Sequence, residues 1–266
     1  MKSVGRRPWA QGPRAPSETG STVANDKVYI HEFIDIIGHH RADYMHHMTA
    51  NWSPIAQEER HQLCYGVWGI VGSTGQWPSV VNMWEEDGWD GLAASFGHEL
   101  GHAHLQDPKL ARWWARAAEF RSGGFDRILV PAPWSPGIEE VCAQGAGGVA
   151  YAHDQVTVPP GAAGDFLELA REAGGAFYAE HGWRLIGAFE TAMRNDDEAF
   201  LLWSIPGWDR WGTAEAALRA GHPWRDRQRA AVRDLRRIVL VDAPLSPLRT
   251  GRQPARRDRD DSWSED

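Results

Sequence analysis

Cysteine is scarce in this chain of 266 residues, with only Cys64 and Cys142 present. Two thiols are too few for the disulfide framework that stabilises many small secreted domains, which favours a reducing cytoplasm. No apolar run reaches the roughly 20 residues that a membrane-spanning helix needs. Positive charges are outnumbered as well, with 28 Lys and Arg against 36 Asp and Glu. The formal net charge of −8 disfavours a general nucleic-acid surface or docking on anionic lipid.

Several catalytic signatures are absent as well. The sequence contains no P-loop, no strand–GxGxxG–helix unit and no G-x-S-x-G elbow, so nucleotide binding and α/β-hydrolase chemistry have no support. The N-terminal residues 1–26 carry basic side chains without an apolar core, which does not resemble a secretion signal. We expect residues 1–26 and the charged residues 248–266 to be disordered tails.

The chain contains an internal repeat. Three segments recur in the same order, and the members of each pair lie 122, 119 and 111 residues apart: YIHEFIDI (Tyr29–Ile36) with YAHDQVTV (Tyr151–Val158), WEEDGWD (Trp84–Asp90) with WSIPGWD (Trp203–Asp209), and ILVPAPWSP (Ile128–Pro136) with VLVDAPLSP (Val239–Pro247). This indicates a duplicated unit. The first repeat spans 27–137, the second 149–247, and residues 138–148 link them.

Each unit has the pattern of strand, helix, two strands, helix and closing strand. The first strand, at 28–36, is rich in β-branched and aromatic residues, and the second helix begins near Trp89 or Trp208, just before an aspartate. The order βαββαβ is the ferredoxin-like arrangement, whose sheet leaves one face uncovered. We therefore predict an α+β fold in which two tandem ferredoxin-like repeats form an intramolecular α/β barrel.

The segments YIHEFIDI, VVNMWEEDGWDGL, LQDPKLARWWARAAEF and FDRILVPAPWSP resemble the NIPSNAP-like family of the dimeric α/β-barrel superfamily, with two repeats fused in tandem. The resemblance covers roughly residues 27–247. It implies the barrel fold and small-molecule chemistry without selecting a reaction, because the superfamily includes monooxygenases, cyclases, isomerases and haem-dependent enzymes.

The segment His98-Glu99-Leu100-Gly101-His102 matches the H-E-x-x-H pattern of zinc peptidases. His98 and His102 share a helix face, and Glu99 could act as base toward a metal-bound water. A peptidase is disfavoured, because the motif lies on a helix that the repeat already requires and no third ligand follows. Two interpretations remain: a non-peptidase site for zinc, iron, copper or manganese, or histidines on a helix surface.

A second histidine cluster lies in GHHRADYMHHM, where His39 and His46 are spaced to share a helix face with Asp43. His39 or His46 could complete a metal site with His98 and His102, although a solvated helix face is the simpler interpretation. Haem is less favoured, because no axial histidine can be singled out. The sequence does not otherwise identify a cofactor.

The repeated strand carries a symmetric set of side chains. Tyr29 and His31 correspond to Tyr151 and His153, and each pair lies on one strand face. If that face points into the barrel, the four groups could serve as acid–base groups or ligands, with the tyrosines orienting substrate. The alternative is a pair of buried structural histidines. The opposite face carries Glu32 and Asp154.

These observations favour an enzyme of secondary or catabolic metabolism, oxygenase-, isomerase- or cyclase-like, that binds an apolar organic substrate in the barrel. The expected catalytic residues are His31, His153, Tyr29 and Tyr151, with Glu99 as the base of a metal site. One alternative is a metal-dependent enzyme centred on His98, Glu99 and His102. Another is a non-catalytic binding or oligomerisation module, such as a homodimer formed through unpaired sheet edges or helix faces.

Overall fold

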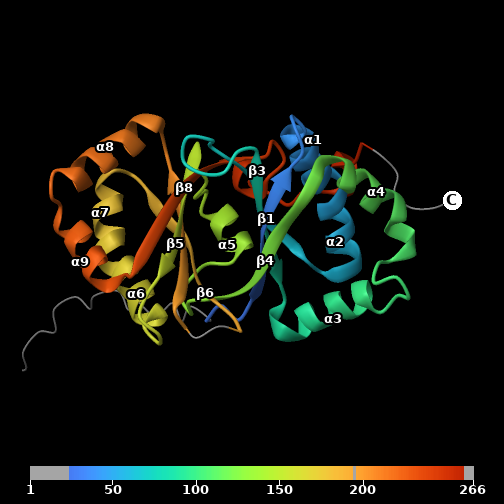
Figure 1. Ribbon diagram of the computed structural model, residues 1–266, viewed down its shortest axis with the longest axis horizontal. Helices are drawn as coiled ribbons and strands as arrows, with labels where there is room; N and C mark the ends of the chain where they lie inside the picture. Colours follow the sequence, from blue (N-terminus) through green and yellow to red (C-terminus); the bar gives the residue numbers. More distant parts are fainter. Residues whose placement is uncertain (1–23, 194–195, 261–266) are drawn as a thin grey trace, which may run out of the picture.

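The computed structural model describes residues 24–193 and 196–260. Within these ranges eight strands form one closed barrel in the order β1-β3-β2-β8-β5-β7-β6-β4 (Figure 1). Their bounds are β1 (Val28–Ile36), β2 (Leu63–Ile70), β3 (Ser79–Glu86), β4 (Arg121–Pro131), β5 (Ala150–Thr157), β6 (Arg184–Thr191), β7 (Glu198–Ile205) and β8 (Asp234–Asp242). The N-terminal tail expected at 1–26 falls almost wholly outside the described residues.

The strand order reflects the duplication. The first repeat contributes β4-β1-β3-β2 and the second contributes β8-β5-β7-β6, all with antiparallel neighbours. The two sheets join where β2 pairs with β8 and β4 pairs with β6. The predicted α+β fold of two ferredoxin-like repeats in one barrel is therefore confirmed. Because each described strand has two neighbours, oligomerisation through unpaired sheet edges has no basis in this barrel.

Helices cover the outer face of each sheet, at opposite ends of the molecule in Figure 1. The first repeat has α1 (Arg41–His46), a π-helical segment at His47–Trp52, α2 (Ser53–Arg60), α3 (Gly88–Leu100), a 3₁₀ turn at Pro108–Leu110 and α4 (Ala111–Phe120). The second has α6 (Ala163–Leu169), a π-helical segment at Ala170–Gly174, α7 (Gly175–Glu180), α8 (Trp208–Arg219) and α9 (Pro223–Ala231).

Side-chain alternation along the strands creates three hydrophobic cores. On β1, Tyr29 packs inside the barrel, whereas Ile34 and Ile36 pack against the helices of the first repeat. On β5, Tyr151 packs inside, whereas Ala152 and Val156 pack against the helices of the second repeat. Two layers of helices therefore enclose a barrel that has a packed interior of its own.

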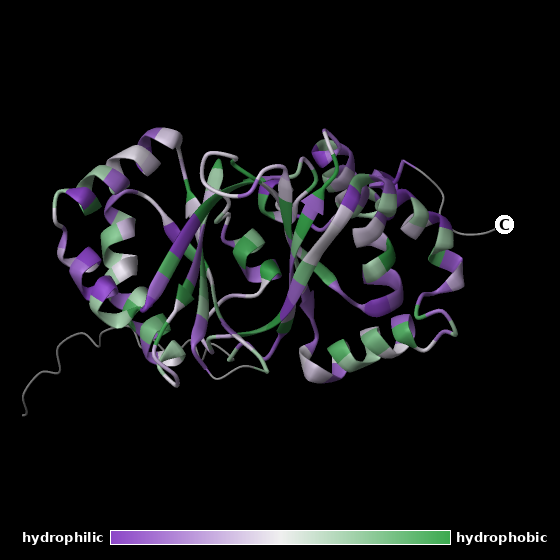
Figure 2. Cartoon of the chain, viewed as in Figure 1, coloured by the Kyte–Doolittle hydropathy of each residue, from purple (hydrophilic) through white to green (hydrophobic). Residues whose placement is uncertain are grey.

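The segment linking the repeats contains a helix, α5 (Ile138–Ala143), which lies between the two sheets in Figure 1 and is largely hydrophobic in Figure 2. Its Ile138 and Val141 are buried in the same cluster as the barrel interior. The exposed α9, by contrast, is mostly hydrophilic. The linker therefore covers part of the barrel core.

The C-terminal segment is more ordered than expected. After the short helix α10 (Pro247–Thr250) and a 3₁₀ turn at Arg256–Asp258, the chain packs on the first repeat. The Gln253 side chain makes two hydrogen bonds to the backbone of Cys64, at 2.8 and 3.0 Å. The expectation of disorder from residue 248 onward is therefore wrong for 248–260, because paired backbone and side-chain groups hold this segment. Residues 261–266 lie outside the described ranges.

None of the helices in the described ranges has the length and apolarity of a bilayer-spanning segment. Cys64 and Cys142 are both free thiols.

Candidate functional site

The structure brings the two repeated histidines into contact inside the barrel. The Nε2 atoms of His31 and His153 lie 2.9 Å apart, and both side chains are almost completely buried. Burial lowers the pKa of His153 to about 4 and that of His31 well below its usual value, with the Arg127 cation adding to both shifts. Both imidazoles are therefore neutral at physiological pH.

The two tyrosines are also inside, where each donates a hydrogen bond to a carboxylate. Tyr29 donates to Glu85 Oε2 at 3.0 Å, and the same oxygen accepts from the backbone N–H of Ile138 at 2.8 Å. Tyr151 donates to Asp242 Oδ2 at 2.6 Å. These bonds connect strand β1 to the start of α5 and strand β5 to β8. The expected inward face is thus the one that carries Tyr29, His31, Tyr151 and His153.

The barrel interior has no room for an organic substrate. The space beside His31 and His153 has a volume of about 10 Å³, which is no larger than one water molecule needs. Its walls include Trp68, Phe189 and Phe200. The expectation of a substrate inside the barrel is therefore wrong for the described structure, because large side chains from both repeats fill the space.

A ligand-sized pocket lies instead outside the barrel, between the first repeat's sheet and its helices. Its volume is about 610 Å³, within the range of small-molecule sites. Its aromatic walls come from Trp52, Trp84, Trp113 and Trp114. Phe96 of α3 is half exposed at the pocket and completes an apolar surface suited to a flat organic molecule.

Two carboxyl groups face each other in this pocket. Glu32 on β1 and Asp126 on β4 are direct partners across the two strands, and both line the pocket. Burial raises the pKa of Glu32, and the charge of Asp126 raises it further. The pKa of Asp126 is also raised by partial burial, against the opposing effect of Arg121. Such a pair holds a proton more readily than isolated carboxylates do.

The Glu32 carboxyl is held in place by two donors. Asn82 Nδ2 and Trp84 Nε1 both donate to its Oε2 atom, at 2.7 and 2.8 Å. Asn82 and Trp84 lie on β3, the other neighbour of β1. These bonds favour the ionised form of Glu32 and so oppose the effect of burial on its pKa. They also fix the orientation of the group.

The second repeat has an ion pair at the equivalent positions. Asp154 corresponds to Glu32 and Arg237 to Asp126, and they too are direct cross-strand partners. Arg237 forms a bidentate ion pair with Asp154 at 2.6 and 2.7 Å, and Trp203 Nε1 donates to Asp154 at 3.2 Å. The guanidinium packs over Tyr178. The second repeat is therefore neutralised and filled where the first has two acids and a pocket.

The Glu32–Asp126 pair is absent from the residues predicted from the sequence, although the sequence contains a signal for it. The recurrence of ILVPAPWSP as VLVDAPLSP, continued two residues toward the N-terminus, aligns Asp126 with Arg237. The first repeat thus has an acid where the second has a base, while Glu32 and Asp154 are both acids. This alignment shows that the two repeats differ in charge at these positions.

The pocket also contains buried polar atoms that have no hydrogen-bond partner among the described residues. They include Nε1 of Trp113, Nε1 of Trp114, Nε of Arg60 and Oε1 of Gln62. An unpaired buried donor or acceptor costs roughly 1–3 kcal/mol. These atoms have almost no exposed surface, so a ligand in the pocket reaches them only if the surrounding side chains move.

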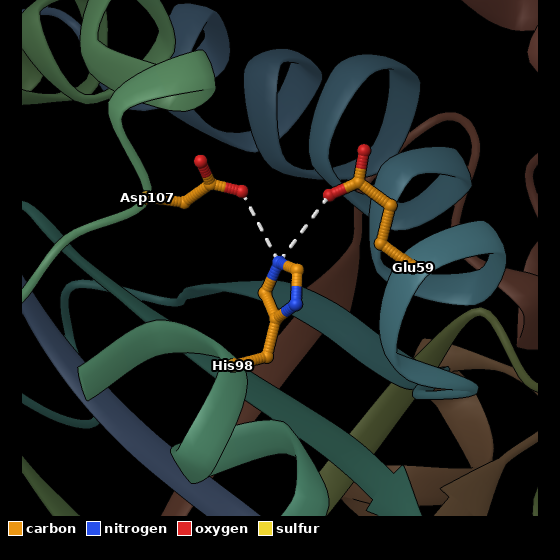
Figure 3. Close-up of side chains that lie close together, drawn as sticks. All are labelled: Glu59, His98 and Asp107. Atoms are coloured by element: carbon orange, nitrogen blue, oxygen red, sulfur yellow. Dashed lines mark hydrogen bonds and ion pairs between the residues drawn. The ribbon is translucent and has the colours of Figure 1, made fainter. Parts of the chain in front are cut away.

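The H-E-x-x-H segment adopts a different geometry from that of a zinc peptidase. Glu99, expected as a base, forms a short ion pair with Arg60 of α2 and lines the pocket. His98 Nε2 lies 3.1 Å from Asp107 Oδ2 and 3.8 Å from Glu59 Oε2 (Figure 3). His102 Nε2 lies 3.9 Å from Asp107 Oδ1. His98 and His102 therefore do converge, but on Asp107.

The other expected metal ligands lie apart from this group. His39 is exposed and stacks on His40. His46 is also exposed and contacts Asp260 Oδ2 at 2.7 Å. Among the described residues, the one group of three potential metal ligands is Glu59, His98 and Asp107, which includes neither His39 nor His46.

Comparisons with known proteins show similarity in fold. No family model and no curated protein matches the sequence. An anthrone oxidase-like protein matches with a TM-score of 0.54 at 13% identity, covering 82% of this chain and 92% of its own. A protein from Lactobacillus acidophilus NCFM, described as a candidate monooxygenase, matches with a TM-score of 0.53 at 9% identity. The match covers 82% of this chain and 94% of that protein. The likeness is one of fold, an antiparallel α/β barrel. Here it closes within one chain.

The NIPSNAP resemblance has a weaker structural counterpart. An uncharacterized NIPSNAP domain protein from Burkholderia xenovorans covers 36% of this chain and 95% of its own, with 16% identity and a TM-score of 0.31. This value is too low to bear on family membership within the α/β barrels.

Haem does not fit the large pocket of this α/β barrel. Its described lining residues include no histidine, cysteine or tyrosine that could ligate the iron; Met48 and Met193 are present, but methionine ligates haem iron together with a histidine. The space beside His31 and His153 is far too small for a porphyrin.

Proposed function

We propose that the protein is a small-molecule enzyme that performs proton-transfer chemistry in the pocket of the first repeat. The observation that carries the proposal is the Glu32–Asp126 carboxyl pair, at the position where the second repeat has the Asp154–Arg237 ion pair. A duplicated fold would be stabilised by the same neutral pair in both repeats. Two acids beside a pocket of about 610 Å³ instead favour chemistry.

The pair can act as a general acid and a general base. Burial and the charge of Asp126 both raise the proton affinity of Glu32, and burial raises that of Asp126. Once the pair takes up one proton, it offers one acid and one carboxylate. The carboxylate takes a proton from an acidic C–H or O–H group of the substrate, and the acid returns a proton to another atom of the same molecule. Isomerisation and ring closure need nothing more. An oxygenase-like reaction would add molecular oxygen as co-substrate.

The pocket favours a flat aromatic or polyketide-like molecule with ketone or phenol oxygens. The tryptophan rings would contact its faces, and the Glu32–Asp126 pair would contact its oxygens. Since the structural neighbours show the fold alone, the reaction class depends on the pocket. In this proposal His31, His153, Tyr29 and Tyr151 stabilise the barrel and do not contact substrate.

We propose a NIPSNAP-like member of the superfamily, supported by the sequence segments that show the resemblance. We propose a cytoplasmic location, supported by two free cysteines. If two chains associate, the helix faces would form the contact, since the barrel of the described residues is closed.

The experiment uses aromatic ketones whose acidic C–H groups exchange with solvent. Anthrone and 2-tetralone are incubated with the full chain in deuterated buffer, and deuterium incorporation is followed by NMR; quenching of tryptophan fluorescence reports binding. We expect Glu32→Gln to bind the ketones but to lower the exchange rate by about 10²–10⁴-fold. Asp35→Asn is the matched control, because Asp35 is a carboxylate on β1 outside this pocket.

Equal exchange rates for Glu32→Gln and the unchanged chain would refute the acid–base role. Ketones that leave the tryptophan fluorescence unchanged would refute the substrate class.

A further inference from the structure

Three side chains from separate segments meet on the outer side of the first repeat: Glu59 from α2, His98 from α3, and Asp107 from the turn before the 3₁₀ segment (Figure 3). One ligand atom from each lies within 4.8 Å of the others. Tetrahedral donors around a zinc ion, at bond lengths of about 2.0–2.2 Å, lie roughly 3.3–3.6 Å apart. The distances of 3.1 and 3.8 Å from His98 Nε2 to the two carboxylates bracket this value.

The surrounding contacts orient these ligands. Arg60 and Glu99 form a largely buried ion pair, with side-chain exposures of 6% and 13%, which holds α2 against α3. Since Glu59 precedes Arg60 and His98 precedes Glu99, the same pair sets the two ligands opposite each other. Asp107 is buried, and its Oδ1 atom accepts from the backbone N–H of Lys109 at 2.9 Å, which leaves Oδ2 toward His98.

A fourth donor is within reach. His102 follows His98 by one helical turn, and its Nε2 atom lies 3.9 Å from Asp107 Oδ1. The rings of His98 and His102 are 6.1 Å apart between centroids. A side-chain rotation of the half-buried His102 could bring its nitrogen into a tetrahedral position.

We propose that Glu59, His98 and Asp107 bind one divalent transition-metal ion, best Zn²⁺, with His102 as the fourth ligand. Imidazole together with carboxylates selects zinc or cobalt over magnesium and calcium, which prefer all-oxygen sites. Glu99 is not a ligand and supplies no base to the ion, because it is paired with Arg60. The motif therefore contributes its two histidines, and two carboxylates outside the motif complete the site.

The ion has a structural consequence for the pocket. It would tie the end of α3 and the following loop to α2, and Arg60 and Glu99, the chain neighbours of the ligands Glu59 and His98, both line that pocket. Metal binding would thus stiffen one pocket wall. This inference does not depend on the proposed reaction, since metal binding is measured without any organic ligand.

The test measures zinc binding to the full, untagged chain by calorimetry with a competing chelator, and Co²⁺ binding by the visible absorption of a tetrahedral site. We expect one ion per chain. Glu59→Gln and His98→Ala should each weaken binding by about 10-fold or more. One matched control is Glu58→Gln, since Glu58 lies on α2 beside Glu59 but pairs with Arg256 of the C-terminal 3₁₀ turn. The other is His104→Ala, since His104 is an exposed histidine of the loop that carries Asp107. Both controls should bind as the unchanged chain does.

Glu59 is exposed, so Glu59→Gln tests the site without disturbing the core, and circular dichroism confirms the fold of each metal-free variant. Zinc affinity that is unchanged in both Glu59→Gln and His98→Ala would overturn the proposal. So would a loss of affinity in His104→Ala equal to that in His98→Ala, because the ion would then be held by surface histidines in general.

Discussion

His31 and His153 lie 122 residues apart in the chain, yet their Nε2 atoms form a 2.9 Å contact at the centre of the barrel. Each histidine comes from the first strand of its repeat, so this contact joins the two repeats. Because both rings are buried and neutral, one Nε2 carries the proton and donates while the other accepts. Like the Tyr29–Glu85 and Tyr151–Asp242 hydrogen bonds, the pair is a polar contact within a largely apolar interior.

The first prediction concerns acid stability. The folded pKa of His153, about 4, is below the usual value of 6.5, so between these pH values the unfolded state binds more protons. His31 shifts in the same direction. The histidines therefore stabilise the fold fully above pH 6.5, and this contribution falls as the pH drops toward 4, by about 1.4 kcal/mol per pH unit for each ring.

Carboxyl groups with raised pKa values stabilise the fold as the pH falls, which opposes the effect of the histidines. The contribution of the histidines is therefore measured as a difference between two chains. The free energy of unfolding is measured in urea from pH 4 to 8 for the unchanged chain and for His31→Leu/His153→Leu. We expect the double variant to lose less stability on acidification. A steeper loss in the variant would contradict the buried neutral pair.

The second prediction contrasts the two repeats. Replacing Glu32 by Gln removes one of two like charges and keeps an acceptor for Asn82 and Trp84, so stability should stay the same or rise. Replacing Asp154 by Asn leaves the largely buried Arg237 with only the more exposed Glu215, 3.5 Å away, as its counter-charge, which should cost up to about 3–5 kcal/mol. Thermal unfolding of both variants at pH 7 checks this, and equal losses would show that the two positions are not energetically distinct.

The third prediction concerns Glu86, a fully buried carboxyl group that accepts from Gln62 Nε2 at 2.7 Å. Burial raises its pKa to about 7. A carboxyl group with a raised folded pKa stabilises the fold at low pH, and this contribution is lost as the pH rises from 4.5 through 7. Glu86→Gln should therefore be more stable than the unchanged chain at pH 8, with a smaller difference at pH 5. Urea unfolding at the two pH values measures it, and a difference that is larger at pH 5 would exclude a raised pKa.

The fourth prediction tests a close approach in strand β2. A Cβ atom at Gly66 would lie 2.0 Å from the ring of Trp68, which is buried and has no room to move. Gly66→Ala should lower the free energy of unfolding by several kcal/mol through steric overlap. In contrast, a Cβ at Gly97 in α3 meets nothing within 4 Å, so Gly97→Ala should stabilise the helix by about 0.5–1 kcal/mol. Chemical denaturation of both variants provides the comparison, and a fully stable Gly66→Ala would disprove the contact.

Much of the fold could be predicted because the repeat is visible in the sequence. The recurrence of Tyr29 and His31 as Tyr151 and His153 placed equivalent strands in two units, and the alternation of residues defined two faces on each. In the order βαββαβ each sheet has one face without helices, so the two sheets are expected to cover each other. The C-terminal segment was misjudged, because its composition is charged and its contacts, such as Gln253 with the backbone of Cys64, are distant in sequence.

The candidate site was less accessible to sequence reasoning. Periodicity gives the spacing of side chains along one strand but not which face turns inward, and it gives no volume. The symmetric His31–His153 pair therefore seemed the better site, although large side chains from both repeats close the space around it. The H-E-x-x-H motif showed which two histidines share a helix face, but not that Glu99 pairs with Arg60.

The sequence by itself determined the duplication, the order of elements and the identity of the two strand faces, because these follow from local periodicity and internal recurrence. Only the tertiary structure decided that the interior is filled, that the pocket lies between sheet and helices, and that Glu32 faces Asp126 while Asp154 faces Arg237. The volume of the pocket and the pairing of charges depend on contacts between side chains from strands that are far apart in the chain. Packing of the folded chain determines these contacts.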